Sequence, residues 1–163
     1  MSLYTGEKVW GLYESSAKAA VRKLSGLRIC CGDPPGFAGL NGWVFEKTVQ
    51  YCLERELRAL RARLDTHEQE SFPGRMRADL RVGRAVIEIK QSGLFSPAAL
   101  IKCRKNRHAV CRSGYEYLFL AGGERYRPYR EGVVKALGKE NAFFLDTSGD
   151  WERFVRRVLA LYR

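Results

Sequence analysis

Strand-like segments alternate with helix-like segments over the second half of the chain, and this order constrains the fold more than any other feature. The strand-like segments are rich in β-branched and aromatic residues, whereas the helix-like segments have apolar residues at helical spacing. In chain order these segments are residues 84–91, 96–112, 115–122, 132–139 and 142–147. Ser96 and Pro97 form a strong helix start, because serine caps a first turn and proline tolerates the first helical position.

The rest of the chain adds helices at both ends and more strands before the alternation. We expect helices over residues 7–24, with Gly26 as a stop, over 41–63 and from about 150 onward, a loop over 30–42, and strands over 66–72 and 75–82. This order predicts an α/β fold with a central mixed sheet flanked by helices. We expect a single domain over residues 1–163, made of an N-terminal helix and loop (1–40), a core (41–121) and a C-terminal part (122–163).

Basic residues dominate the composition, and their excess is concentrated. The formal net charge is +11, and ten basic but only two acidic residues lie between Arg75 and Arg112. Such a segment suits a polyanion, because each cation placed on a phosphate releases counterions. A solvated basic face without a partner is the alternative.

The sequence also predicts where the protein resides. No apolar run approaches the roughly 18 residues that a membrane-spanning helix needs, and the first residues do not have the pattern of a secretory signal. Five cysteines, two of them adjacent, favour free thiols over a disulfide framework. We therefore expect a cytoplasmic protein that does not associate with a membrane.

Three charged residues lie in the two strands that surround the turn near Gly83. Glu88 and Lys90 are two residues apart and therefore share a face of their strand. A four-residue loop over 82–85 would place Asp79 directly opposite Glu88, with Cβ atoms about 5 Å apart. Two carboxylates this close repel each other unless a cation lies between them, and Mg²⁺ favours such oxygen ligands. An exposed edge hairpin with alternating core and solvent faces is the other interpretation.

A further carboxylate lies on the apolar stripe of the helix expected over 41–63. The stripe consists of Val49, Leu53, Leu57, Leu60 and Leu64. Glu46 lies three residues before Val49 and so continues this stripe. A buried carboxylate needs a proton, a basic partner or a metal, although Glu46 could instead lie half-exposed in the first turn of the helix. Glu54 and Glu56 fall mostly off the stripe, and we expect them to be solvent-exposed charges.

The chain resembles the restriction-endonuclease-like, or PD-(D/E)xK, nuclease superfamily in one sequence pattern. The pattern consists of Asp79, eight intervening residues and Glu88-Ile89-Lys90, preceded by a helix that carries Glu46. The element order over residues 41–121 is similar to the core of that family. The chain has Ala78 where the family often has proline, and it lacks the Gln-x-x-x-Tyr helix motif of the exonuclease branch after Lys90.

The resemblance implies a metal-dependent nuclease that hydrolyses DNA phosphodiester bonds, such as an endonuclease or a Holliday-junction-resolvase-like enzyme. Asp79 and Glu88, with the Ile89 carbonyl, would bind Mg²⁺, for which Mn²⁺ would substitute, and Glu46 would hold a second ion. Lys90 would orient or activate a water molecule. The catalytic set implied is therefore Asp79, Glu88, Lys90 and Glu46.

Nucleic-acid contacts are expected from basic residues outside this set and from one amide. They are Gln91, Lys102, Arg104, Lys105, Arg107, Arg125 and Arg127. DNA is the favoured partner, RNA and a homodimer are further options, and a non-catalytic nucleic-acid-binding protein on the same fold is the main alternative. An unrelated α/β module that binds RNA or an acidic protein through its basic helix is the third.

Overall fold

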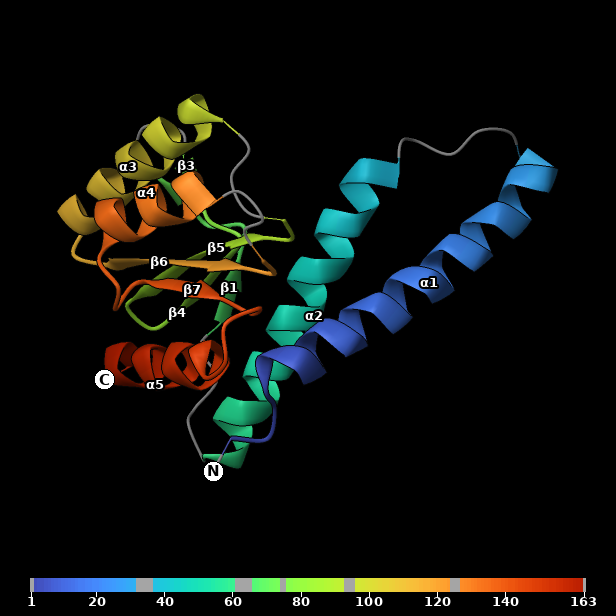
Figure 1. The fold of residues 1–163 in the computed structure, drawn as a ribbon, viewed down its shortest axis with the longest axis horizontal. Coiled ribbons are helices and arrows are strands. Elements are labelled where there is room, and N and C mark those ends of the chain that lie inside the picture. Colours follow the sequence, from blue (N-terminus) through green and yellow to red (C-terminus); the bar gives the residue numbers. More distant parts are fainter. Residues whose placement is uncertain are drawn as a thin grey trace.

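The structure, a computed structural model, describes residues 2–31, 37–60, 66–73, 76–92, 96–123 and 127–162, and within them all side chains except those of 24–31, 37–39 and 127–128. The chain has a mixed α/β architecture in which helices flank a five-stranded mixed sheet (Figure 1). This confirms the predicted α/β class and mixed sheet.

The five-stranded sheet joins an antiparallel half to a parallel half. Its strands, in spatial order, are β1 (Thr66–Glu68), β4 (Leu80–Val82), β5 (Ala85–Lys90), β6 (Glu116–Ala121) and β7 (Ala142–Phe144). The pairs β1–β4 and β4–β5 are antiparallel, whereas β5–β6 and β6–β7 are parallel. A small antiparallel sheet of β2 (Ser71–Phe72) and β3 (Met76–Arg77) is inserted between β1 and β4.

Helices cover the two faces of the sheet unequally. The first face packs against α1 (Gly6–Cys31), α2 (Phe37–Ala59) and α5 (Asp150–Tyr162), and the second against α3 (Pro97–Arg112) and α4 (Arg127–Leu137). Because side chains alternate along a strand, Ile87 and Ile89 enter the first core and Val86 enters the second. The paired helices α1 and α2 extend away from the sheet (Figure 1).

The N-terminal helix differs from the prediction. It passes through Gly26 and ends at Cys31, and α2 begins at Phe37, so part of the predicted loop over 30–42 is helical, while residues 32–36 lie outside the described part. A glycine within a helix costs only about 1 kcal/mol, so Gly26 alone does not end α1.

The predicted strand over 66–72 is broken in two. Gln69 has a φ of 55°, a left-handed conformation that ends β1 before β2 begins. The predicted strand over 75–82 is also broken, into β3 and β4, with Asp79 in a bend between them. The strands β1, β4 and β5 therefore form the antiparallel meander, with the β2–β3 hairpin as an insertion. Helix α4 begins at Arg127, five residues earlier than expected, and ends at Leu137.

Local signals explain the elements that carry the site. Gly83 has a φ of 55° in the two-residue turn between β4 and β5, and left-handed residues at such turns match the twist of the strands. The Ser96 side chain accepts a hydrogen bond of 3.2 Å from the Ala99 amide, which confirms the predicted start of α3.

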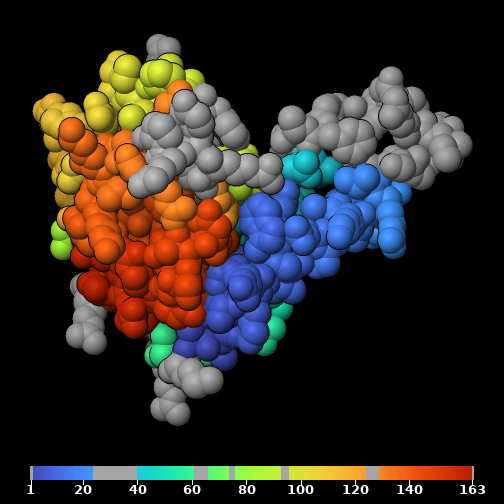
Figure 2. Space-filling model, in the orientation of Figure 1, coloured from blue at the N-terminus to red at the C-terminus, as the bar shows by residue number. Residues whose placement is uncertain are grey.

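The start of α1 packs closely on the C-terminal half of the chain. A Cβ atom on Gly6 would lie 2.4 Å from the Leu145 carbonyl oxygen, so only glycine allows this approach. Figure 2 shows the N-terminal helix in blue against the orange and red C-terminal elements. Across the part of the chain that is described, helices of sufficient length and apolar character to cross a bilayer are absent.

Candidate functional site

Asp79, Glu88 and Lys90 meet at the end of β5. The register pairs Leu80 with Ile87, and one more step places Asp79 opposite Glu88, the arrangement predicted for a loop over 82–85. The Lys90 ammonium lies 2.6 Å from Glu88 Oε1 and 3.6 Å from Asp79 Oδ2. Two strand carboxylates therefore share one positive charge.

The two carboxylates are held in a poorly solvated position. The Asp79 and Glu88 side chains are only 14% and 12% exposed. The Ile89 amide donates a hydrogen bond of 2.7 Å to Asp79 Oδ2, which fixes this carboxylate against β5. Ile89 thus orients Asp79 through its amide, and its predicted role as a carbonyl ligand stays a prediction.

The electrostatics of this cluster leave its negative charge undercompensated. Burial raises the pKa of Glu88, and Asp79 raises it further, even though the neighbouring Lys90 lowers it. Burial alone would lower the pKa of Lys90, but Glu88 and Asp79 raise it above its ordinary value. The carboxylates therefore hold the ammonium charged, and one ammonium is not enough to keep the pKa of Glu88 at its usual value.

Glu46 of α2 approaches the same cluster from the first face of the sheet. Its half-buried carboxyl has its pKa raised to about 7, first by burial and then by the charge of Asp79. A cavity of about 310 Å³, which we call the carboxylate cavity, lies between α2 and the sheet. It is lined by Trp43, Glu46, Lys47, Gln50, Glu68, Gln69, Asp79, Leu80 and Ile89. The helix carboxylate predicted from the apolar stripe therefore lines a cavity together with Asp79.

The donors of this cluster are of the chemical type that a hard divalent cation prefers. They are carboxylate oxygens, which Mg²⁺ prefers, and the Lys90 ammonium already occupies a cation position between two of them. As the side chains stand, no three His, Cys, Asp or Glu residues within the described ranges form a group that could hold a metal ion. The fit thus rests on the shared ammonium and on the raised pKa values of Glu46 and Glu88.

A basic surface on α3 leads to Glu88. One hollow beside this helix is lined by Pro73, Arg104, Lys105, His108, Ala109, Arg112 and Ser113. A second is lined by Met76, Arg77, Glu88, Ala98, Ile101, Lys102, Lys105 and Asn106. Lys105 borders both hollows, so the positive charge of the helix continues up to the carboxylate. We call these two hollows together the α3 surface.

The other residues predicted to contact nucleic acid are placed differently. Arg107 donates a hydrogen bond of 2.8 Å to the Ala136 carbonyl and so ties α3 to α4. Gln91 lies over the first face, pairs with the Tyr13 hydroxyl and borders a hollow separate from the carboxylate cavity. Arg125 and the side chain of Arg127 lie outside the described residues.

The apolar stripe of α2 is buried only in part. Val49, Leu53 and Leu57 are fully buried as predicted, but Leu60 is 49% exposed because α2 ends at Ala59, and Leu64 lies outside the described residues. The stripe nevertheless turns the Glu46 side of α2 toward the sheet.

Glu56 is a clear correction to the sequence analysis. It is 1% exposed instead of solvent-facing, and it accepts hydrogen bonds from the Leu3 and Tyr4 amides at 3.0 and 2.9 Å and from Trp151 Nε1 at 3.3 Å. Burial opposes ionisation of Glu56, but these donors lower its pKa overall. Its partners lie far away in sequence, so no local pattern could have identified them.

Sequence reasoning also missed the residues that complete the carboxylate cavity. Lys47 forms an ion pair with Glu68, and Gln50 donates to Glu68 at 2.7 Å, so α2 is fastened to β1 beside Glu46. Trp43, one helical turn before Glu46, lines the cavity and is 56% exposed. The spacing from Glu46 was the available signal for Trp43 and Lys47.

Comparison of the chain with family models, with curated proteins and with solved structures finds no match.

Proposed function

We propose that this protein is a metal-dependent nuclease with a restriction-endonuclease-like core, which hydrolyses phosphodiester bonds of DNA. One observation carries the proposal. Two nearly buried carboxylates, Asp79 and Glu88, share a single ammonium, and a third carboxyl with a raised pKa, that of Glu46, lines a cavity together with Asp79. Carboxyl groups with perturbed pKa values that lie in a cleft beside a charged partner are typical of catalytic sites.

The residues of the cluster have distinct proposed roles. Asp79 and Glu88 would hold Mg²⁺ or Mn²⁺, and Glu46 and the Ile89 carbonyl would complete the ligand set. A bound divalent ion supplies positive charge to phosphoryl oxygens and lowers the pKa of a water molecule. Lys90 would orient the attacking water and offset negative charge that develops at the phosphate.

The α3 surface would hold the nucleic-acid backbone beside the cut. Lys102 and Lys105 lie next to Glu88, and Arg104 and Arg112 continue the positive charge away from it. Phosphate contacts of this kind position a substrate without reading its sequence. The concentration of ten basic residues between Arg75 and Arg112 supports a polyanionic substrate.

A non-catalytic nucleic-acid-binding protein is the second candidate, because the α3 surface would serve it equally well. Divalent-ion dependence separates the two functions. A nuclease should cut some member of a panel of duplex, branched and single-stranded DNA and RNA in Mg²⁺ or Mn²⁺, and it should stop in EDTA.

Variants of the strand carboxylates test the assignment of the site. Asp79→Asn and Glu88→Gln should abolish cleavage while nucleic-acid binding survives or tightens, since each removes a negative charge that faces phosphate. Glu116→Gln is the matched control, because Glu116 begins β6 and pairs with Arg157 instead of with the cluster. Normal cleavage by either site variant would refute the metal assignment. Metal-independent binding without cutting across the whole panel would favour the binding protein.

A further inference from the structure

A strongly exposed tryptophan lies at the rim of the candidate site. Trp43 is 56% exposed, although it belongs to α2, whose other side enters the core. It lies three residues before Glu46 and four before Lys47, so the three share one side of the helix. One helical turn spans about 5.4 Å. An aromatic ring therefore lies about one turn from a carboxyl of the site.

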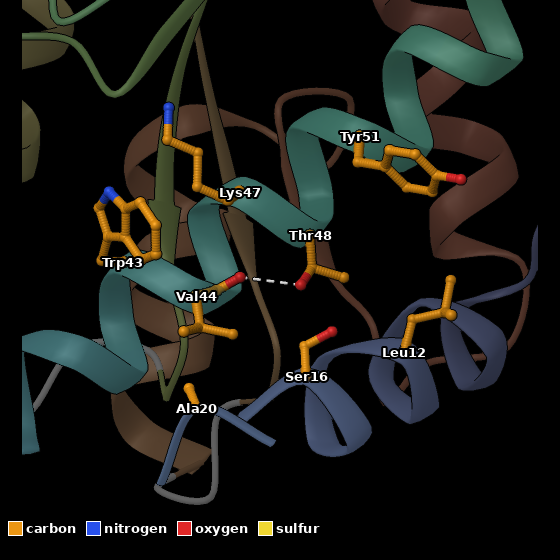
Figure 3. A pocket seen from close by; sticks show the side chains of 8 residues that line it. All are labelled: Leu12, Ser16, Ala20, Trp43, Val44, Lys47, Thr48 and Tyr51. Atoms are coloured by element: carbon orange, nitrogen blue, oxygen red, sulfur yellow. Dashed lines mark hydrogen bonds between the residues drawn. The ribbon is translucent and has the colours of Figure 1, made fainter. Parts of the chain in front are cut away.

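Trp43 also lines a second hollow, which runs between α1 and α2. This groove has a volume of about 440 Å³ and is lined by Leu12, Ser16, Ala20, Trp43, Val44, Lys47, Thr48 and Tyr51 (Figure 3). Figure 3 shows Leu12, Ser16 and Ala20 on α1 opposite the α2 residues. Trp43 and Lys47 border both hollows, so the groove and the carboxylate cavity adjoin at these two side chains.

The two hollows differ in chemistry. The carboxylate cavity is bordered by Glu46, Glu68 and Asp79, whereas the groove is mainly apolar apart from Lys47, Thr48 and Ser16. A nucleotide likewise has one polar and one apolar part, namely an anionic phosphate and a flat, largely apolar base. A phosphate bound at the site would place an adjoining base near the indole.

We infer that Trp43 is a stacking platform for an unpaired base next to the phosphate that is cut, so that the substrate has a single-stranded or flipped-out nucleotide at this position. The inference rests on the proposed nuclease function for the identity of the neighbouring site. Base-on-aromatic stacking needs a free base face, which a fully paired duplex does not offer. Stacking of this kind tolerates any sequence, because every base has a flat face.

The test measures binding without cleavage. The Glu88→Gln chain is titrated in EDTA with oligothymidine and with a blunt duplex of matched length, and both Trp fluorescence and the anisotropy of a labelled oligonucleotide are followed. We expect oligothymidine to quench the fluorescence and the duplex to quench it much less. Trp151 is fully buried, whereas Trp10 is only partly buried, so the loss of quenching in Trp43→Leu identifies Trp43 as the ring that responds.

Substitutions at Trp43 separate stacking from simple apolar burial. Trp43→Leu should lose the quenching and weaken oligothymidine binding about 5- to 100-fold, from the usual strength of stacking on an aromatic ring. Its salt dependence should not change, because no phosphate contact is removed. Trp43→Phe keeps a flat ring and should retain most of the affinity without the quenching. Leu60→Ala, at an exposed apolar position near the end of α2, is the matched control and should bind normally.

Several outcomes would overturn the inference. Equal quenching by duplex and by oligothymidine would remove the requirement for an unpaired base. An oligothymidine affinity that is unchanged in Trp43→Leu would show that Trp43 does not stack on a base. If Trp43→Leu also changed the oligomeric state seen in sedimentation, the groove would be assigned to a second copy of the chain. The two proposals can be refuted separately. A protein that cuts nucleic acid but shows no quenching would refute the stacking role of Trp43, and a protein that is quenched but never cuts would refute the nuclease function.

Discussion

Replacing Glu46 by glutamine should stabilise the metal-free protein, with a gain that appears above about pH 4.5 and is complete above about pH 7. Burial and the charge of Asp79 raise the pKa of Glu46 from 4.5 to about 7. A carboxyl group with a raised folded-state pKa makes no unfavourable contribution below pH 4.5. Its cost grows between pH 4.5 and 7, where the folded state binds more protons than the unfolded state, and stays constant above pH 7.

The size of the stabilisation follows from the difference between the folded and unfolded pKa values of Glu46. The full rise would cost about 3 kcal/mol above pH 7, at about 1.4 kcal/mol for each pH unit. Because Glu46 is only half-buried and solvent screens its charge, we expect about 1–2 kcal/mol. Glu46→Gln removes the ionisation and keeps the shape of the side chain, so its free energy of unfolding should exceed that of the unchanged protein by this amount at pH 8.

Urea unfolding in EDTA at pH 5 and pH 8 provides the measurement. The gain at pH 8 should shrink strongly at pH 5, where the Glu46 carboxyl is mostly protonated. Glu54→Gln is the control on the same helix, since Glu54 pairs with Gln50 and Arg58 near the surface and should show no such gain. If Glu46→Gln and the unchanged protein have the same stability difference between pH 5 and pH 8, Glu46 does not carry the raised pKa and the reasoning is refuted.

Two further predictions concern α3 and the N-terminus. Arg104→Ala should make the slope of log binding constant against log salt concentration shallower by about one unit for duplex DNA. Arg107→Ala should leave that slope unchanged and should instead lower the stability of the protein, because Arg107 donates a hydrogen bond to the Ala136 carbonyl. Equal slopes for both variants would remove Arg104 from the interface. Glu56→Gln should lower the free energy of unfolding by about 2–3 kcal/mol, since it places an amide donor against buried donors, and thermal unfolding should show a fall of several degrees. The loss should shrink as the pH falls through the lowered pKa of Glu56, and a variant with unchanged stability at pH 7 would contradict its anchoring role.

The elements with local signals could be predicted from the sequence. The Ser96 cap fixed the start of α3, and the two-residue spacing of Glu88 and Lys90 placed both on one strand face. The register predicted for a loop over 82–85 brings Asp79 opposite Glu88, and the structure has this register. Glu46 could be placed because its position continues a buried helical stripe, whose periodicity depends only on the helix itself.

The remaining features depend on partners that are distant in sequence. Glu56 lies beside the same stripe, but it is buried because the N-terminal amides and Trp151 reach it from 52 or more residues away. Arg104 and Arg107 are both basic residues of the same helix, and only the contact of Arg107 with the Ala136 carbonyl of α4 distinguishes them. Tertiary contacts override local propensity in each case.

The most direct test of the central claim is a crystal of the unchanged protein soaked in Mn²⁺ and measured for anomalous scattering. We expect a peak bound by the carboxylates of Asp79 and Glu88, on the side of the cluster that faces Glu46. The same soak of Glu88→Gln should lose or strongly weaken that peak. A soaked crystal of the unchanged protein with no anomalous peak near these carboxylates, and with the Lys90 ammonium still between Asp79 and Glu88, would contradict the claim that this cluster is a metal-dependent catalytic centre.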